Sequence, residues 1–539
     1  MSARSFSREV DPPPLCGRHP STFQFVLGAI VAVCVAVYLV HSLRWPLVND
    51  AVLLRYATFL RQHGFAPYRE VLDYNLPGSY FADWLVVHTL GASAFAWRVY
   101  DLSLLAISST AMYWMVRRYD RFAGFYAAAG FALFHARNGI AQAGQRDLAM
   151  AASILTGAAI LLYRPGKPSL AATFFFGLCI GAASTIKPTA ILAMPLVLLA
   201  RFEKEESRDA LGARARPGRI VAAALAGMLV APVAALGWLG AHHATAAFWT
   251  IVSQLVPLHE RLGYLGFWAL FTRIFTAAHG TMALLAIFLM LRCRDAKLDR
   301  LRLFLIVGIG AGFLSYFVQA KGYPYHRYLF VAFLFLFAAL EFSHALRWPG
   351  YRRVVAAGGL VFLAVLGILS TVRSVRDRWP DEPVQSLARD LNSLGGAALS
   401  GDVQCIDTID SCLATLYRLR LVQSTGMMYD EFLFVPPDSA KPRQSAVLAE
   451  LRRIFLAELA SRPPRVLIVT PWLFPAGPDH YAKLDRWSAF EQFVAGCYQL
   501  QLQRDFTSSP REHSGYRLYV RRQTVCALPL RTPSADSIP

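Results

Sequence analysis

The chain has 539 residues, of which 55% are hydrophobic and only 17% are charged. A soluble protein of this size carries roughly 25% charged residues, so the composition excludes an ordinary soluble protein and predicts one that crosses a membrane many times. The formal net charge of +19 does not indicate nucleic-acid binding, because the lysines and arginines are dispersed between apolar runs rather than gathered on one domain.

Long apolar runs predict a multi-span membrane domain over residues 23–371. It follows a cytoplasmic N-terminal tail, residues 1–22, which has no clear cleavage site, so we expect the first run to be a retained signal anchor. The run 80–97 is apolar too, but it contains Asp83 and His88, so we expect it to lie along the membrane surface. The expected spans are 23–40, 99–116, 122–137, 148–163, 170–186, 188–200, 219–240, 276–291, 303–318, 329–346 and 354–371.

The charges of the loops give these spans an orientation. With the N-terminus in the cytoplasm, the loops on the cytoplasmic side carry nearly twice as many lysines and arginines as those on the other side, as the positive-inside rule requires. The first extracytoplasmic loop is then 41–98, with juxtamembrane helices. The odd number of spans places residues 372–539 outside the cytoplasm.

Residues 372–539 are more polar and are predicted to form an extracytoplasmic α/β domain. The apolar run Val466–Val469 and the alternation over 516–520 predict strands, and 383–394 and 445–460 have helical patterns. The fold class that follows is a polytopic α-helical membrane protein with a C-terminal α/β domain.

Half of the eight cysteines lie in this domain, namely Cys405, Cys412, Cys497 and Cys526. Disulfides form in the compartment expected for it. Cys405 and Cys412 are a candidate pair, although spacing alone does not set the connectivity. The four lack the partners of a metal site, so zinc is not expected.

Asp50 lies about ten residues beyond the first apolar run. Leu53, Leu54, Ala57 and Leu60 follow it at helical spacing, which predicts an amphipathic helix that begins at Asp50. Position alone leaves two roles open for this carboxylate. It is either a cap of the helix, or a base held at the edge of the membrane, where it can take a proton.

The next two outer loops hold further charges. Asp147 closes a short polar loop at the start of a span. It is either a second acid of the same centre or the cap of that span, which is the role that position alone favours. Lys187, followed by Pro188, lies at an outer turn and is either a phosphate ligand or a plain turn cation.

Lys321, His326 and Arg327 lie together among tyrosines in a later outer loop. The positive-inside rule disfavours cations on that side, so their presence needs a reason. One reason is a phosphate or pyrophosphate ligand, to which Arg gives bidentate contacts and Lys a point charge. The other is anchoring of these side chains in the membrane interface.

Other titratable residues carry less information. His242, His243 and His259 match no metal motif and are expected to be satisfied surface histidines. Nothing singles out Asp101 or His135. The sequence contains no P-loop, no Gly-rich dinucleotide fingerprint and no Gly-x-Ser-x-Gly, so ATP-driven and serine-hydrolase activities lack support.

Taken in order, the outer-loop motifs resemble the membrane glycosyltransferases of the GT-C fold. Within that fold they resemble the group that holds the protein O-mannosyltransferases and the lipid A aminoarabinose transferase (glycosyltransferase family 39/83-like). The resemblance covers about residues 20–370. The matching pieces are 49–57, Gly64 with 67–69, 75–80, Gly91 with 96–98, 145–147, Lys187-Pro188 and 319–327.

The resemblance implies transfer of a monosaccharide from a polyprenyl-phosphate donor to a glycan, lipid or protein acceptor, outside the cytoplasm at a bacterial inner (plasma) membrane. Asp50 matches the first-loop acid that acts as general base for inverting transfer, and Asp147 matches a second acid. Four residues would hold the donor phosphate, namely Lys187, Lys321, His326 and Arg327.

The sequence departs from the family pattern at two positions. Ala51 stands where the mannosyltransferases have Glu, and Leu76 precedes Pro77 where some relatives place a cation. The sugar and the acceptor are therefore left undetermined. A divalent metal ion stays open as a cofactor, and the expected partners are the donor, the acceptor and membrane lipids.

Two other classes of function compete with this one, a transporter or flippase and a non-catalytic scaffold. A transporter or flippase of a lipid-linked or anionic solute would place its charges midway along spans, often at broken helices, whereas these charges gather at one face. A scaffold that only displays the outer domain would not need eleven spans.

Overall fold

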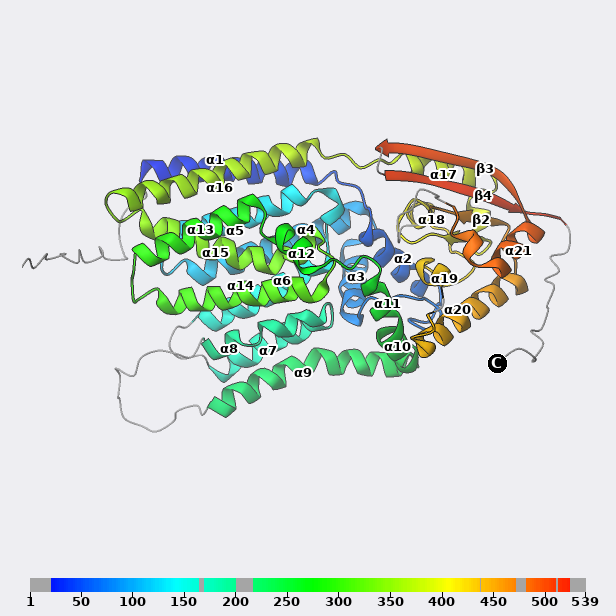
Figure 1. Cartoon of the computed structure of the whole chain (residues 1–539), viewed down its shortest axis with the longest axis horizontal. Coiled ribbons are helices and arrows are strands. Elements are labelled where there is room, and N and C mark those ends of the chain that lie inside the picture. Colours follow the sequence, from blue (N-terminus) through cyan, green and yellow to red (C-terminus); the bar gives the residue numbers. More distant parts are fainter. Residues whose placement is uncertain are drawn as a thin grey trace, which may run out of the picture.

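The computed structural model describes residues 21–163, 169–199, 217–436, 438–471, 481–509 and 512–523. It consists of a long bundle of helices and, at one end of this bundle, an α/β region with a sheet (Figure 1). The predicted N-terminal tail lies outside the described residues except for Ser21 and Thr22, and Cys526 lies outside them as well.

A helix stands at each of the eleven expected spans. Long apolar runs favour helices in a membrane protein because a helix satisfies its own backbone hydrogen bonds. The eleven are α1 (Thr22–Ser42), α4 (Ala94–Val116), α5 (Arg121–Asn138), α6 (Arg146–Leu162), α7 (Leu170–Ser184), η2 with α8 (Pro188–Ala193 and Leu196–Leu199), α9 (Pro217–Ala241), α13 (Ala277–Arg292), α14 (Asp299–Gln319), α15 (Tyr328–Ala345) and α16 (Tyr351–Arg376).

The helices differ in how well they suit a membrane span. Among the described residues, six helices are long and apolar enough to cross a membrane, or seven if the bent pair of α12 (Phe267–Ile274) and α13 is one span. Others, such as α7 and η2 with α8, are shorter apolar helices. The predicted class of a polytopic helical membrane protein is confirmed.

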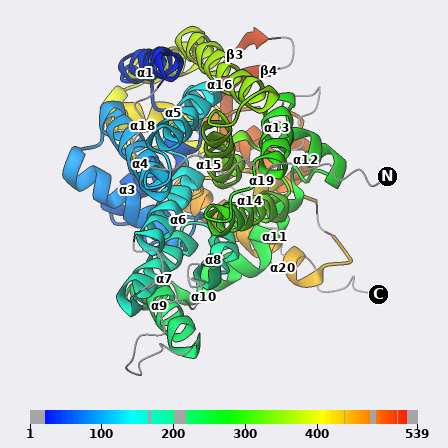
Figure 2. The same ribbon diagram turned by 90° about the vertical axis from the view of Figure 1, so that its left-hand side faces the viewer.

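Helix α15 occupies the centre of the bundle (Figure 2). All 18 of its residues are buried, because α5, α13, α14 and α16 pack around it. Its sequence is apolar all round, as a helix enclosed by other helices requires.

The first loop forms two more helices between the bundle and the α/β region, α2 (Asp50–Gln62) and α3 (Pro77–Leu90) (Figure 1). Residues 51–60 of α2 are all buried, so the helix predicted to be amphipathic is covered on every side. Its polar residue Arg55 pairs with Asp83 of α3 (Nε–Oδ1 3.0 Å), and neither side chain reaches solvent.

The apolar stretch 80–97 is not a single helix, which corrects the sequence expectation. Helix α3 ends at Leu90 because Gly91 has a φ of 93°, a conformation that favours glycine. Ser93 then caps α4 by accepting a hydrogen bond from the N–H of Ala96 (3.1 Å). The stretch 80–97 is therefore divided between α3 and the start of the span α4. Helix α3 exposes several large apolar side chains.

The C-terminal region holds a four-stranded sheet in the order β1-β2-β4-β3. Strands β1 (Val403–Ile406) and β2 (Val466–Val469) are parallel, β2 runs antiparallel to β4 (Glu512–Arg521), and β4 pairs with β3 (Tyr498–Ser509). Both β1 and β2 are buried along their whole length. The apolar sequence of β2 predicts this burial, whereas β1 also buries the polar side chain of Gln404. The strands expected at 466–469 and 516–520 are β2 and part of β4.

Helices cover this sheet and join it to the bundle. The helical patterns at 383–394 and 445–460 correspond to α17 and α20. The helices of the C-terminal region are α17 (Glu382–Ser393), η5 (Gly396–Leu399), α18 (Cys412–Leu419), α19 (Glu431–Phe434), α20 (Pro442–Ser461), η6 (Leu484–Arg486) and α21 (Ser488–Cys497). The remaining short elements of the bundle are η1 (Ile140–Gln142), α10 (Thr245–Thr250), the π-helical turn η3 (Ile251–Leu255), α11 (Val256–Arg261) and η4 (Pro324–Arg327).

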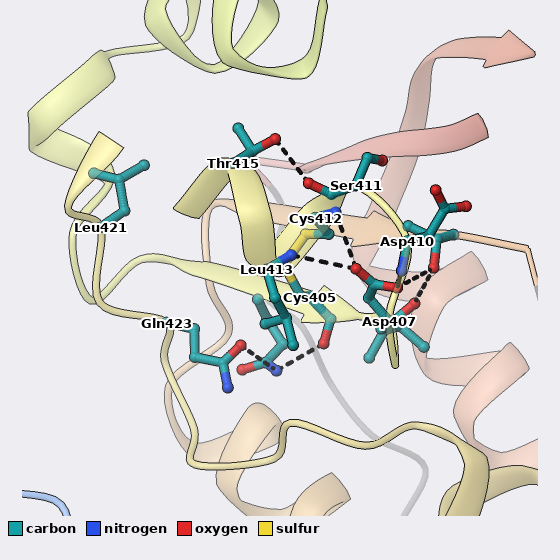
Figure 3. Close-up of a disulfide and its surroundings, with 12 residues drawn as sticks. Cys405, Asp407, Asp410, Ser411, Cys412, Leu413, Thr415, Leu421 and Gln423 are labelled. Atoms are coloured by element: carbon teal, nitrogen blue, oxygen red, sulfur yellow. Dashed lines mark hydrogen bonds between the residues drawn. A yellow bond between two sulfur atoms is a disulfide. The ribbon is translucent and has the colours of Figure 1, made fainter. Parts of the chain in front are cut away.

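Cys405 of β1 and Cys412, the first residue of α18, form a disulfide (Figure 3). The pairing proposed from the sequence is therefore confirmed. Between the two cysteines, the carboxylate of Asp407 accepts hydrogen bonds from the backbone N–H groups of Cys412 (2.9 Å) and Leu413 (3.2 Å). The disulfide and this carboxylate fix the end of β1 against the start of α18.

Candidate active site

Asp50 is the first residue of α2 and lies next to the first residue of α6. Its carboxylate Oδ2 accepts a hydrogen bond from Nη2 of Arg146 at 3.4 Å. The residue at the cap position is Asn49, which has a φ of 52° and no capping side-chain hydrogen bond. Asp50 therefore pairs with another helix instead of capping its own.

Asp147 and Lys187, two residues singled out in different loops, lie together. Asp147 is fully buried near the start of α6, and Nζ of Lys187 lies 3.4 Å from its Oδ2. The same Nζ donates a hydrogen bond to Oε1 of Gln319 (3.1 Å), at the end of α14. Lys187 is thus held between two helices and does not act as a plain turn cation.

Lys321 belongs to the same group of charges. Its side chain is buried, and its Nζ lies 3.9 Å from Oε1 of Glu260. Burial lowers the pKa of Lys321 to about 8, with Lys187 and Arg146 adding to the shift and Glu260 and Glu431 opposing it. These five charged groups are therefore close enough to influence one another.

His326 is buried in η4 and packs against two aromatic rings. The centroid of its ring lies 5.4 Å from that of Tyr323 and 4.6 Å from that of Tyr325. Its Nδ1 is buried and has no hydrogen-bond partner among the described residues. His326 is thus a polar group available to a ligand.

The structure separates Arg327 from this group, although the sequence places the two residues side by side. Nη1 of Arg327 donates to the carbonyl of Arg273 (3.0 Å), and its guanidinium lies over the ring of Phe134 (5.6 Å). Arg327 and Arg137 line another crevice of the bundle. Successive side chains on a 3₁₀ turn are about 120° apart, so adjacent residues of η4 face different surroundings.

A buried network behind the site holds the loop that carries Arg146. Asp101 of α4 forms an ion pair with Arg98, and its Oδ2 lies 3.1 Å from Nε2 of His135. Its other oxygen accepts a hydrogen bond from the N–H of Gly144 (2.5 Å). Asp101 and His135, which the sequence did not single out, therefore fix the approach to α6.

Three further residues belong to the site. Nothing in the sequence singles out Tyr74 or Glu431, and His259 was predicted to lie at the surface. Nδ1 of His259 lies 2.7 Å from Oε1 of Glu431 in α19, and Tyr74 stacks on the imidazole with centroids 4.2 Å apart. His259 is therefore enclosed between the two parts of the molecule and is not the surface histidine that was expected. No local pattern marks Glu431, because only the contact between the two parts brings it here.

The described residues contain no group of three or more His, Cys, Asp or Glu side chains that could hold a metal ion. The divalent metal that the sequence left open thus has no ready set of ligands in the part of the chain that the structure describes. The charged groups of the site are carboxylates and fixed cations.

Comparisons with known proteins give the fold. Neither a protein-family model nor a curated protein sequence matches the chain. Among solved structures, ArnT from Cupriavidus metallidurans bound to undecaprenyl phosphate matches with a TM-score of 0.52 and 14% identity, over 92% of this chain and 98% of ArnT.

The archaeal oligosaccharyltransferase AglB from Archaeoglobus fulgidus, in complex with an inhibitory peptide and a dolichol-phosphate, matches with a TM-score of 0.48 and 13% identity. This match covers 93% of this chain and 75% of AglB. At such low identity the likeness to ArnT establishes a shared architecture and nothing finer. The chain therefore has the GT-C fold of the membrane glycosyltransferases, as the outer-loop motifs predicted.

Proposed function

We propose that this protein is a membrane glycosyltransferase that moves a monosaccharide from a polyprenyl-phosphate donor to a glycan, lipid or protein acceptor. The observation that carries the proposal is the gathering of Asp50 and Asp147 with three cations, Arg146, Lys187 and Lys321. The shared fold supports it, because the structure of ArnT is bound to undecaprenyl phosphate.

In this proposal Asp50 is the general base. It takes the proton of an acceptor hydroxyl while the acceptor oxygen bonds to the anomeric carbon and the bond from that carbon to the phosphate oxygen breaks. The electron pair leaves with the polyprenyl phosphate, and attack from the opposite side inverts the configuration. The hydrogen bond from Arg146 at 3.4 Å orients the base before the substrates arrive.

Lys187, Lys321 and His326 are proposed to hold the donor phosphate. Lys187 and Lys321 are fixed cations, which stabilise the negative charge that develops on a departing phosphate and act more strongly where water is excluded. Burial holds the pKa of His326 well below its usual range, so this residue would donate a hydrogen bond as a neutral imidazole. Asp147 keeps Lys187 in position through their 3.4 Å contact. Arg327 is left out of this role, because its contacts lie elsewhere.

The proposed site faces away from the cytoplasm, with the N-terminus inside, in the inner membrane of a bacterium. The loops on the opposite side of the membrane carry more lysine and arginine, and the positive-inside rule assigns such loops to the cytoplasm, which supports this orientation. The C-terminal region lies at one end of the bundle beside α2, whose first residue is Asp50 (Figure 1). The site and the C-terminal region would therefore meet the same compartment.

The test is transfer by the purified full-length protein, given a panel of polyprenyl-phosphate sugars and an envelope extract as the acceptor. Asp50→Asn keeps the shape of the side chain but cannot take the proton, so we expect transfer to fall about 10²- to 10⁴-fold. Asp381→Asn is the control, because this carboxylate lies at the surface, where it accepts hydrogen bonds from Arg418 (3.0 Å) and Gln385 (2.7 Å).

Full activity in a folded and inserted Asp50→Asn variant would overturn the assignment of the base. Movement of the lipid-linked sugar across a vesicle membrane without cleavage of its phosphate bond would instead support a flippase.

A further inference from the structure

Glu431, the first residue of α19, has one partner for two carboxylate oxygens. Oε1 faces Nδ1 of His259 at 2.7 Å. Oε2 is buried and has no hydrogen-bond partner among the described residues, and the residue as a whole is 1% exposed. A buried carboxylate oxygen without a partner is costly, so its presence in a folded protein needs an explanation.

Contacts of His259, the partner of Oε1, hold Glu431 in position, and Oε2 takes no part in them. The imidazole of His259 stacks on Tyr74 with ring planes 27° apart, and Tyr74 in turn contacts Tyr429, with centroids 4.6 Å apart. Tyr429 donates a hydrogen bond to Asp73 (3.2 Å). The carboxylate is therefore presented on a rigid support made by both parts of the molecule.

The negative charges of Glu431 and Asp50 influence the pKa values of the same neighbouring groups. Burial raises the pKa of Tyr74 well above its ordinary value, and the charges of Glu431 and Asp50 both add to the shift. The pKa of Tyr323 is raised to about 12 by burial, again with contributions from Asp50 and Glu431. The charge of Glu431 also reaches Lys321. The geometry agrees, because His259, the partner of Glu431, is followed in the chain by Glu260, whose Oε1 lies 3.9 Å from Nζ of Lys321. The carboxylate of Glu431 therefore borders the candidate active site.

The chemistry of a carboxylate limits what it can recognise. It accepts hydrogen bonds from hydroxyl and ammonium groups, and it repels phosphate. We infer that Glu431 is a substrate-recognition residue, supplied by the C-terminal region, that accepts a hydrogen bond from a hydroxyl or ammonium group on the transferred sugar or on the acceptor. This inference rests on the proposed function, and it makes the site a composite of both parts of the chain.

The test uses the purified full-length protein, undecaprenyl-phosphate sugars as donors and a bacterial envelope extract as the acceptor. Glu431→Gln keeps the size of the side chain and an oxygen toward His259, but an amide nitrogen replaces the unpaired oxygen and cannot accept a hydrogen bond. We expect kcat/KM to fall about 10- to 100-fold, the range for a lost hydrogen bond to a buried charged group. A rise in the KM for the donor identifies the sugar as the group contacted, and a rise for the extract identifies the acceptor.

Three controls separate recognition from folding. Glu450→Gln removes an exposed carboxylate that pairs with Arg453 (2.6 Å) on α20, and it should behave as the wild type. Undecaprenyl phosphate without a sugar should bind Glu431→Gln at least as tightly as it binds the wild type, because in this inference Glu431 contacts the sugar or the acceptor and not the phosphate. Glu431→Asp, which keeps the charge, should recover part of kcat/KM.

The inference fails if Glu431→Gln leaves kcat/KM unchanged for every donor while the wild type is active. It also fails if the variant loses thermal stability and binding of undecaprenyl phosphate together, which is the behaviour of a structural residue. If the wild type binds the sugar lipids but does not transfer the sugar, only the proposed function is overturned. In that case the inference still predicts weaker binding of the sugar lipids to Glu431→Gln than to the wild type, and equal binding overturns it.

If the wild type neither binds nor transfers, both the proposed function and the inference are overturned.

Discussion

At the scale of single residues, the site is assembled from the ends of helices. Asp50 begins α2 and Arg146 begins α6, and Lys187 stands just before η2. Side chains at such ends are fixed by the helix behind them yet remain open to a ligand in front. This explains how charges far apart in the sequence can be held within a few ångströms of one another.

The state of Lys321 makes a prediction about pH. Its pKa is lowered to about 8 by burial, so the side chain is charged below this pH and neutral above it. If it holds the donor phosphate, kcat/KM for the donor should fall about tenfold for each pH unit above 8. In Lys321→Arg the guanidinium stays charged, so this alkaline fall should disappear. Lys321→Gln should be weak at every pH.

The measurement is kcat/KM for a polyprenyl-phosphate sugar between about pH 6.5 and 9.5, because this ratio reports the free enzyme. An alkaline fall that persists unchanged in Lys321→Arg would show that another group titrates.

At the scale of elements, helices α7 and α9 pack closely because glycines lie at their contact. A Cβ added at Gly177 would lie 1.9 Å from the carbonyl oxygen of Ala224, and one at Gly181 would lie 2.1 Å from that of Met228. Small residues four apart allow two helix backbones to approach in this way. The short apolar helix α7 is therefore stabilised by the longer α9.

Gly181→Ala should consequently weaken this pair. The added carbon meets backbone, which cannot move aside, so we expect a loss of about 1–3 kcal/mol and a lower temperature of heat-induced unfolding in detergent. Gly237→Ala on α9 is the matched control, because a Cβ there has nothing within 4 Å. Equal unfolding temperatures for the two variants would contradict the close approach of α7 and α9.

At the scale of the whole molecule, the C-terminal region docks on the first loop through backbone. The N–H of Leu72 donates to the carbonyl of Gly426 (3.1 Å), and a Cβ at Gly426 would lie 1.8 Å from the carbonyl oxygen of Glu70. This contact lies near the start of α19, which carries Glu431. The docking therefore decides whether the composite site exists.

Gly426→Ala should push the two parts of the molecule away from each other. We expect sugar transfer to fall at least about tenfold, because a small displacement of reacting groups is costly, while undecaprenyl phosphate still binds to the bundle. Gly496→Ala in α21 has open space around the added carbon and should transfer as the wild type does. Normal transfer by Gly426→Ala would show that the site does not depend on this contact.

The sequence by itself determined the features that depend on neighbouring residues. Apolar runs located the eleven helices that stand at the expected spans, alternation and apolar character located β2 and part of β4, and the sequence suggested Cys405 and Cys412 as a candidate disulfide pair. These follow from hydropathy and local backbone preference, which act over a few residues. They also sufficed for the class of polytopic helical membrane protein, whereas the GT-C fold was predicted from the resemblance of the outer-loop motifs.

Only the tertiary structure decided which charges meet. It joined Asp50 to Arg146 and Asp147 to Lys187, moved Arg327 away from His326, and brought Glu431 in from the C-terminal region. Such contacts depend on how helices pack and how the two parts dock. They join residues whose separation in sequence is large, so no local pattern encodes them.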